Sequence, residues 1–428
     1  MRRGIAVAAV VLSASAVAGC GSKSGLIVPE LEGGVETDAG RDAGRDAGTD
    51  AGPDAGPPMP DECIELPYLE PPSELEVSFR AQILSADVFF LVDVTGSMGE
   101  EIDQIRARLR DEITPGLVAA IPDVRFGVGH FADFPIPERN YGDIDDDLFV
   151  LLTRAVGNVS VVQMAVDRLP LQGGRDGPEA LVEALYLTAT GEGFGRFAPP
   201  ASCPPGTVGY PCFRADGSRI ILAFTDAPSH NGPGGHDAYE GISPPPHTYD
   251  VTVNALRMIG AKVLGLYSGG AGGVGEMDLV ALARDTGAIR EDGTPIVFDI
   301  GRSGTSLGPS VVEAVRSLVE EVPIDVDVLL EDFEGDSFDA LSFVRGVIAD
   351  RAEPADGATN LGDRFVDVRP GTRVFFRIVL ANDLIPQTDE PQRFYMRVVL
   401  RGDGVTRLQE TLLEVLVPPT GGGVSCSI

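Results

Sequence analysis

Between residues 87 and 322, short apolar runs alternate with longer stretches in which apolar residues recur every three or four positions. Runs such as residues 88–92 and 220–224 are typical of buried strands, and the stretches between them are typical of amphipathic helices. This alternation predicts an α/β fold with a doubly wound, mostly parallel sheet that helices cover on both faces. Pro115 is expected to end the first of these helices.

After residue 322 the period of the apolar residues falls to two, and β-rich runs follow one another between turn residues. This pattern predicts a small antiparallel β-sandwich. Residues 75–79, which precede the α/β part, alternate in the same way and are expected to join that sandwich. The α/β domain is therefore expected to be inserted in the sandwich or followed by it. The expected divisions are residues 62–86 for the first piece of the sandwich, 87–322 for the α/β domain, 323–420 for the rest of the sandwich and 421–428 for the tail.

The first twenty residues have the features of an export signal. Two arginines precede an apolar stretch over residues 5–18, which is short for a membrane span and is followed by small residues. The ending Ala18-Gly19-Cys20 resembles a bacterial lipobox, so Cys20 is expected to carry the lipid that anchors the protein in the cell envelope. The same resemblance implies the outer membrane, because Gly21 in the next position is not the acidic residue that retains lipoproteins in the inner membrane. The alternative is an ordinary secretory signal with an incidental cysteine.

A low-complexity segment follows the signal. Residues 21–61 are dominated by repeats of Asp-Ala-Gly with one variable residue, which have little to bury and predict a disordered tether. The chain has 33 basic and 65 acidic side chains, for a formal net charge of -32. Such a charge excludes nucleic acid as a natural partner and favours cations or basic surfaces. Another acidic cluster, residues 143–147, is interpreted as a solvated turn in preference to a Ca²⁺ loop.

Four cysteines remain after the signal, and an even number in an exported chain indicates disulfide bonds. Cys203 and Cys212 enclose a loop rich in proline and glycine and are expected to pair with each other. That leaves Cys63 to pair with Cys426. Metal ligation by these thiols is the weaker alternative, because no two of them have the Cys-x-x-Cys spacing.

Three distant segments carry oxygen ligands. They are Asp93-Val94-Thr95-Gly96-Ser97, Asp176-Gly177-Pro178-Glu179 and Thr225-Asp226, and the first and third follow predicted strands. Loops at the carboxyl ends of parallel strands meet at one edge of a sheet. Carboxylates and hydroxyls without His or Cys suit Mg²⁺, Mn²⁺ or Ca²⁺ and disfavour zinc and copper. The sequence therefore predicts a divalent-cation site. The nearby histidines His230, His236 and His247 lie in a loop rich in glycine and proline. They are interpreted as loop residues in preference to transition-metal ligands, because their spacing fits no helix or zinc pattern.

With these motifs in this order, the α/β part resembles the von Willebrand factor A domain, and within that group the A-like domain of integrin β subunits. The first segment matches the family's Asp-x-Ser-x-Ser loop with Thr95 in place of the first Ser. Glu179 matches the integrin form of the second loop, and residues 224–227 match the third. The resemblance implies a Mg²⁺ (or Mn²⁺) site with direct ligands Asp93, Ser97 and Glu179, and with Thr95 and Asp226 bound directly or through water.

The resemblance further implies that the bound cation keeps one coordination position open for a carboxylate of a protein partner. Two flanking Ca²⁺ sites are also implied. One would use Glu100 and Glu101, for which the alternative is a helix N-terminus that favours acidic residues. The other would use Asp133, Asp176, Glu179 and the carbonyl of Pro178, although Gly174 stands where the family tends to have Asn. The sandwich resembles the integrin hybrid domain in its placement.

Catalytic motifs are absent from the sequence, which lacks Gly-x-Ser-x-Gly, His-Glu-x-x-His and a phosphate-binding glycine loop before a lysine. The chain is therefore predicted not to be an enzyme. The expected function is a surface-anchored, cation-dependent adhesion or protein-binding module. The alternatives are a structural envelope protein that Ca²⁺ stiffens and an accessory subunit of an enzyme system.

Overall fold

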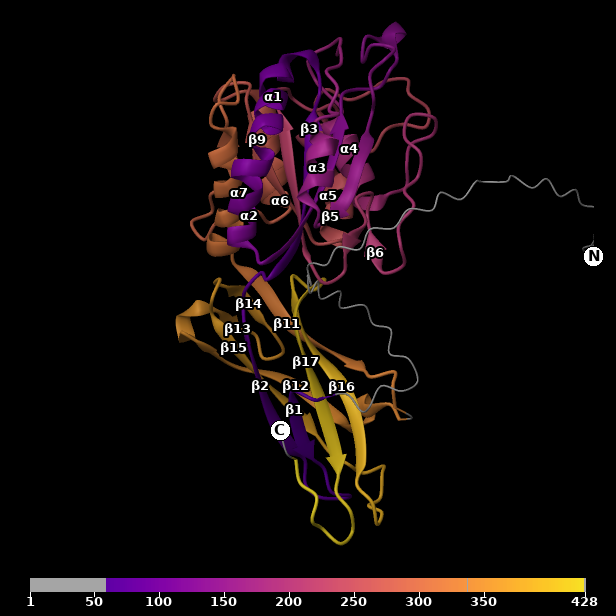
Figure 1. The fold of residues 1–428 in the computed structure, drawn as a ribbon, viewed down its shortest axis with the longest axis vertical. Coiled ribbons are helices and arrows are strands. Elements are labelled where there is room, and N and C mark those ends of the chain that lie inside the picture. The colour runs from indigo at the N-terminus through magenta and orange to yellow at the C-terminus, as the bar shows by residue number, and fades with distance from the viewer. Residues whose placement is uncertain (1–58, 337, 427–428) are drawn as a thin grey trace, which may run out of the picture. The chain divides into compact units, whose positions relative to one another are not determined.

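The structure is a computed structural model that describes residues 59–336 and 338–426 (Figure 1). The predicted signal peptide, its lipidated Cys20 and nearly all of the predicted tether lie outside the described residues. Within the described part of the chain, no helix combines the length and the apolar character that a membrane crossing requires.

A six-stranded sheet forms the centre of the α/β part, in the order β10-β9-β8-β3-β4-β5. All neighbouring strands are parallel except β4 and β5, which are antiparallel. The prediction of a mixed α/β fold is confirmed. The strands are β3 (Ser85–Asp93), β4 (Asp123–Phe131), β5 (Val150–Val156), β8 (Ser218–Thr225), β9 (Ala261–Tyr267) and β10 (Val297–Asp299).

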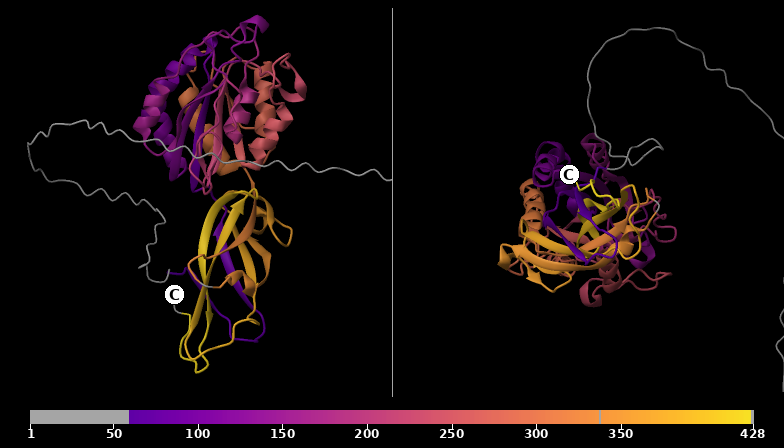
Figure 2. Two further views of the ribbon diagram at one scale, coloured as in Figure 1. Left: turned by 90° about the vertical axis from the view of Figure 1, so that its right-hand side faces the viewer. Right: turned by 90° about the horizontal axis from the view of Figure 1, so that it is seen from below.

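Helices lie on both sides of this sheet, as the turned views show (Figure 2). Phe90 of β3 packs in one hydrophobic cluster with residues of α1, α2, α3 and α7, and its neighbour Phe89 packs in a second cluster with residues of α4, α5 and α6. Because successive side chains of a strand point to opposite faces, a strand covered on both faces must be apolar throughout. The helices are α1 (Gly99–Arg108), α2 (Thr114–Ala120), α3 (Val159–Val166), α4 (Leu181–Thr190), α5 (Tyr249–Met258), α6 (Val274–Asp285) and α7 (Leu307–Glu321).

The prediction that Pro115 ends the first helical segment is wrong. A π-helical turn, Leu109–Ile113, follows α1 and leads directly into α2, in which Pro115 occupies the first turn. A proline is tolerated in the first turn of α2, and the π-helical turn before it interrupts the regular α-helical hydrogen bonding. The chain therefore stays helical from Gly99 to Ala120.

Two further sheets enclose a third hydrophobic cluster. Their strands come from both sides of the α/β part, because β1 pairs with β17 and β2 pairs with β15. The β1–β17 pair is parallel, whereas the sequence predicted an antiparallel arrangement. The six-stranded sheet contains β1 (Glu62–Glu65), β17 (Thr406–Val417), β16 (Gln392–Gly402), β11 (Ile324–Asp332), β14 (Phe365–Val368) and β13 (Thr359–Asn360), and the three-stranded sheet contains β12 (Val344–Glu353), β15 (Arg373–Leu380) and β2 (Ser73–Arg80).

Both predicted disulfide bonds are present. Cys63 of β1 is bonded to Cys426, which lies 363 residues later in the chain. Cys203 is bonded to Cys212 in a loop that also contains the short hairpin of β6 (Thr207–Val208) and β7 (Phe213–Arg214).

Candidate metal centre

The first of the three predicted loops begins where β3 ends. Asp93, the last residue of β3, is fully buried. Its Oδ1 accepts hydrogen bonds from the backbone N–H of Thr95, at 2.9 Å, and from the Thr95 hydroxyl, at 2.7 Å. These bonds turn the chain back over the end of the strand. They also fix the orientation of the Asp93 carboxylate before any ligand arrives.

The third loop, at the end of β8, meets the first through side chains. The hydroxyl of Thr225 donates to Oδ2 of Asp93 at 2.7 Å, and the hydroxyl of Ser97 donates to Oδ1 of Asp226 at 2.9 Å. Strands β3 and β8 are parallel neighbours, so their carboxyl ends lie side by side. Four of the five predicted Mg²⁺ ligands, Asp93, Thr95, Ser97 and Asp226, are thereby brought to one place.

The second loop, which precedes α4, is held against both of the others. The N–H of Gln172 donates to the carbonyl of Val94 at 2.7 Å, and the N–H of Glu179 donates to the carbonyl of Pro228 at 2.9 Å. A Cβ added to Gly174 would lie 3.0 Å from Oε1 of Glu179 and 3.5 Å from Cγ2 of Thr95. The Glu179 carboxylate and the Thr95 side chain therefore border the same space beside Gly174, which brings the fifth predicted ligand to the neighbourhood of the other four.

Burial and neighbouring negative charges disfavour the ionised form of the carboxyl groups in this site. Burial raises the pKa of Asp93 to about 6, and burial together with the carboxylates of Asp93, Asp133, Asp176 and Asp146 raises the pKa of Glu179 to about 11. Among the described residues, Oε2 of Glu179 has no hydrogen-bond partner. Buried carboxylates with no donor are stabilised by a cation. The donor set, composed of carboxylates and hydroxyls, fits the predicted Mg²⁺ or Mn²⁺.

Asp146 also shapes the centre, and sequence reasoning missed it. Its two carboxylate oxygens accept the N–H groups of Gly173 and Gly174, each at 3.0 Å, and the side chain is buried. The interpretation of residues 143–147 as a solvated turn is therefore wrong for Asp146, because the residue holds the second loop in position. The sequence offers no signal that distinguishes it from the neighbouring aspartates.

The residues of the first predicted Ca²⁺ site differ in exposure. Glu101 is buried within α1, whereas Glu100 is exposed to solvent. Burial raises the pKa of Glu101, and within the described part of the chain its Oε2 has no hydrogen-bond partner. The structure places Glu101 toward the interior, and the Ca²⁺ site remains a prediction.

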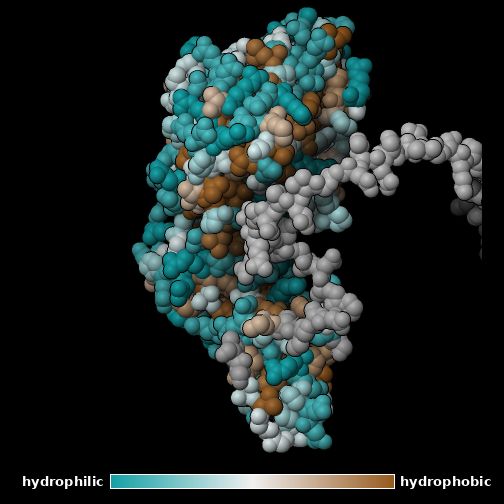
Figure 3. All heavy atoms as spheres, in the orientation of Figure 1, coloured by the Kyte–Doolittle hydropathy of each residue, from teal (hydrophilic) through white to brown (hydrophobic). Residues whose placement is uncertain are grey.

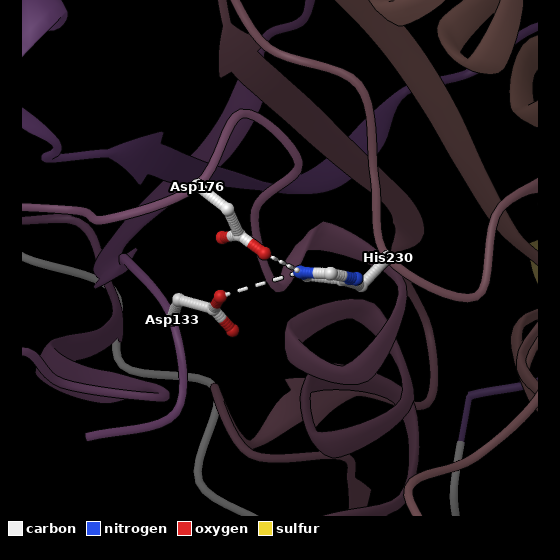
Figure 4. Close-up of side chains that lie close together, drawn as sticks. All are labelled: Asp133, Asp176 and His230. Carbon is white, nitrogen blue, oxygen red and sulfur yellow. Dashed lines mark hydrogen bonds and ion pairs between the residues drawn. The ribbon is translucent and has the colours of Figure 1, made fainter. Parts of the chain in front are cut away.

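The residues of the second predicted Ca²⁺ site lie beside a histidine (Figure 4). Nε2 of His230 is 3.1 Å from Oδ2 of Asp176 and 3.5 Å from Oδ2 of Asp133. Over residues 59–336 and 338–426, these three form the one set of three His, Cys, Asp or Glu ligand atoms within 4.8 Å of one another. The carboxylates of Asp93, Glu179 and Asp226 do not meet that limit. His230 lies in a loop, as predicted, and the structure adds that its side chain is buried in this cluster. Glu179 and Pro178 follow Asp176 in the same loop.

No protein-family model matches the chain, and no curated protein matches its sequence. Solved structures that match with probability 1.00 include a von Willebrand factor type A protein from Catenulispora acidiphila, at 14% identity and a TM-score of 0.31, over 83% of this chain and 72% of that one. Others are proximal thread matrix protein 1 from the mussel byssus (14%, TM-score 0.34, over 59% and 51% of the two chains) and the pilus adhesin SpaC from Lactobacillus rhamnosus GG in an open conformation (11%, TM-score 0.34, over 83% and 46%). The chain spans about half the length of the latter two proteins.

Proposed function

We propose that the protein is a surface-anchored, divalent-cation-dependent adhesion or protein-binding module. Its Mg²⁺ (or Mn²⁺) ligands are Asp93, Ser97 and Glu179 directly, and Thr95 and Asp226 directly or through water. The observation that carries this proposal is the set of hydrogen bonds that joins three distant loops around the buried Asp93.

The chemistry of the ligands explains why the partner is acidic. When bound, the cation supplies a positively charged coordination position to which a carboxylate can attach. Thr95 and Ser97 contribute neutral hydroxyls, so they add no further negative charge that would repel the incoming carboxylate. Ser97 is exposed while Asp93 and Glu179 are buried, which leaves the Ser97 side of the centre accessible from solvent. The surface around the α/β elements is largely hydrophilic in the view of Figure 3, which favours an ionic contact over an apolar one.

The remaining parts of the proposal concern location and organisation. Lipidated Cys20 anchors the protein in the outer membrane, and the tether of residues 21–61 extends from it. The two disulfide bonds support an exported protein, because such bonds persist in oxidising compartments. The doubly wound α/β domain of residues 87–322 is inserted in a hybrid-like β-sandwich. The pairing of β1 and β2 with strands from the end of the chain supports the insertion. The protein is not an enzyme, and Ca²⁺ occupies the Glu100–Glu101 site.

The relaxation rate of water protons around bound Mn²⁺ tests the open coordination position. We expect Mn²⁺ bound to the purified protein to raise this rate, and we expect millimolar acetate to reduce the effect by displacing the bound water. Asp93→Ala should abolish the effect, and Asp250→Ala, at an exposed aspartate of α5, should leave it unchanged.

Because Asp93 is buried, its replacement can also unfold the protein. Ser97→Ala, at an exposed position, therefore provides a second variant and should weaken both Mn²⁺ binding and the response to acetate. If Mn²⁺ binds and acetate leaves the relaxation rate unchanged, the cation has no open position and the adhesion proposal is wrong. That outcome would favour a structural protein stiffened by cations.

A further inference from the structure

His230 is held in one orientation and one tautomer. Its Nδ1 lies 2.6 Å from the carbonyl oxygen of Asp237. A carbonyl only accepts hydrogen bonds, so Nδ1 carries the proton. The ring stacks on Tyr239, with centroids 4.0 Å apart, and the ring of Tyr141 packs edge-on at 5.1 Å. Nε2 is therefore fixed in the direction of the two aspartates.

A proton on Nε2 does not satisfy these aspartates. It would serve Oδ2 of Asp176, at 3.1 Å, while Oδ2 of Asp133, at 3.5 Å, is too far for a good hydrogen bond. Over the described ranges, Oδ2 of Asp133 and Oδ1 of Asp176 are buried atoms without a hydrogen-bond partner. The other oxygen of Asp133 accepts the N–H of Phe134 and the hydroxyl of Tyr239, so this carboxylate is held with one oxygen directed into the cluster.

A buried carboxylate oxygen without a hydrogen-bond partner destabilises the folded protein. Asp133 is 0% exposed, so solvent does not reach its unpartnered oxygen. A buried acceptor without a donor costs about 1–3 kcal/mol, and more if it is charged. One cation between the three side chains would be coordinated by Nε2, by Oδ2 of Asp133 and by a carboxylate oxygen of Asp176 together.

We propose that Asp133, Asp176 and His230 bind a divalent transition-metal cation, for which Zn²⁺ is the natural probe. The imidazole ligand distinguishes this site from the oxygen-only Ca²⁺ site that the sequence suggested, because nitrogen ligands favour zinc and similar metals over Ca²⁺ and Mg²⁺. A ligating histidine whose other nitrogen donates to a backbone carbonyl is a recurrent arrangement in metal sites.

The site would link the second and third loops beside the Mg²⁺ centre. Asp176 belongs to the second loop, His230 follows the third, and the N–H of His230 donates to the carbonyl of Glu179 at 2.9 Å. Its three ligands are separate from the five proposed Mg²⁺ ligands. Zn²⁺ binding here therefore neither requires nor excludes the proposed adhesion function.

Nitrogen-15 NMR of the histidine side chains tests the proposal directly, since the chain has four histidines. We expect one equivalent of Zn²⁺ to shift the Nε2 resonance of His230, and an equal amount of Ca²⁺ or Mg²⁺ to leave that resonance in place. Calorimetry should show that His230→Gln lowers the affinity for Zn²⁺ by at least about 10-fold.

His236→Gln is the matched control, because His236 also lies between two carboxylates but both of its nitrogens are paired, with Asp237 at 2.9 Å and Asp278 at 2.8 Å. This variant should bind Zn²⁺ normally. If His230→Gln fails to fold, Asp176→Asn, at a partly exposed position, replaces it with the same expected loss. Zn²⁺ that leaves the His230 resonance unmoved, or an imidazolium at neutral pH that persists with Zn²⁺, would overturn the proposal. Ser97→Ala, at an exposed position, should retain Zn²⁺ binding even where Mn²⁺ binding is weakened, so the two proposals fail separately.

Discussion

Replacing Gly174 with alanine would have two separate effects. It would lower the free energy of unfolding, and it would weaken the binding of Mg²⁺. Gly174 has φ of +71°, and alanine in the left-handed region costs roughly 1–2 kcal/mol. The new Cβ would lie 3.0 Å from Oε1 of Glu179, where ordinary contacts begin at 3.4 Å, so the carboxylate must move by a few tenths of an ångström. Metal–ligand distances tolerate about 0.2 Å. We therefore expect Gly174→Ala to lower the affinity for Mg²⁺ about 10-fold, in addition to its effect on folding.

Gly206→Ala separates the two contributions. Gly206 has φ of +78°, and no described atom lies within 4 Å of the Cβ that alanine would add. This control should therefore lose a similar free energy of unfolding and keep the affinity for Mg²⁺ of the parent protein. Urea denaturation in EDTA gives the free energy of unfolding, and calorimetry gives the affinity for Mg²⁺.

Two results would contradict this reasoning. Equal Mg²⁺ affinities of the Gly174→Ala and Gly206→Ala proteins would show that Glu179 does not hold the cation from its present position. An unchanged free energy of unfolding in both variants would show that neither glycine is needed for its backbone conformation.

Three further predictions concern stability. Arg214→Met should lower the free energy of unfolding by about 3–5 kcal/mol in urea denaturation, because it leaves the fully buried Asp87 without its 2.8 Å ion pair. Arg345→Met, whose partner Asp383 is exposed, should lower it much less. Equal losses in the two variants would refute the role of burial. Burial lowers the pKa of His130 in the folded protein. As the pH falls below about 6.5, the unfolded chain therefore takes up a proton at His130 that the folded chain does not. The free energy of unfolding should then fall by up to about 1.4 kcal/mol per pH unit. His130→Leu should make that decline shallower between pH 7 and 5, and parallel pH profiles of the two proteins would exclude the effect. Removing the Cys63–Cys426 bond by serine substitution should lower the free energy of unfolding roughly twice as much as removing the Cys203–Cys212 bond. In the chain-entropy model the stabilisation grows with the logarithm of the sequence separation of the two cysteines, which is 363 for the first bond and 9 for the second. The reverse order would argue against that model here.

The sequence predicts the α/β part well because burial on both faces leaves a clear pattern. β3 is buried along nearly its whole length, and such a short run of apolar residues is typical of a strand covered on both faces. Strand β1 left no such pattern, since its four residues Glu62–Glu65 alternate only weakly. Its parallel pairing with β17 depends on contacts more than 300 residues away in the chain.

The candidate site likewise contains some residues that the sequence predicts and others that it does not. Asp93 and Asp226 are predictable because each stands directly at or after the end of an apolar strand, where ligands gather. His230 is not, because its partner Asp176 lies 54 residues away and a single histidine in a loop rich in glycine and proline has no local spacing to interpret. Asp146 was missed because its importance comes from two backbone amides of another loop.

The bond between Cys63 and Cys426 has a mechanical consequence. Tension on the chain before Asp61 reaches β1 first, which is only four residues long and would peel from β17 under modest load if hydrogen bonds alone held it. The covalent link lies two residues after Asp61 and passes that tension to Cys426, which follows β17. Under such tension the sandwich would thus lose structure elsewhere before β1 separates from it.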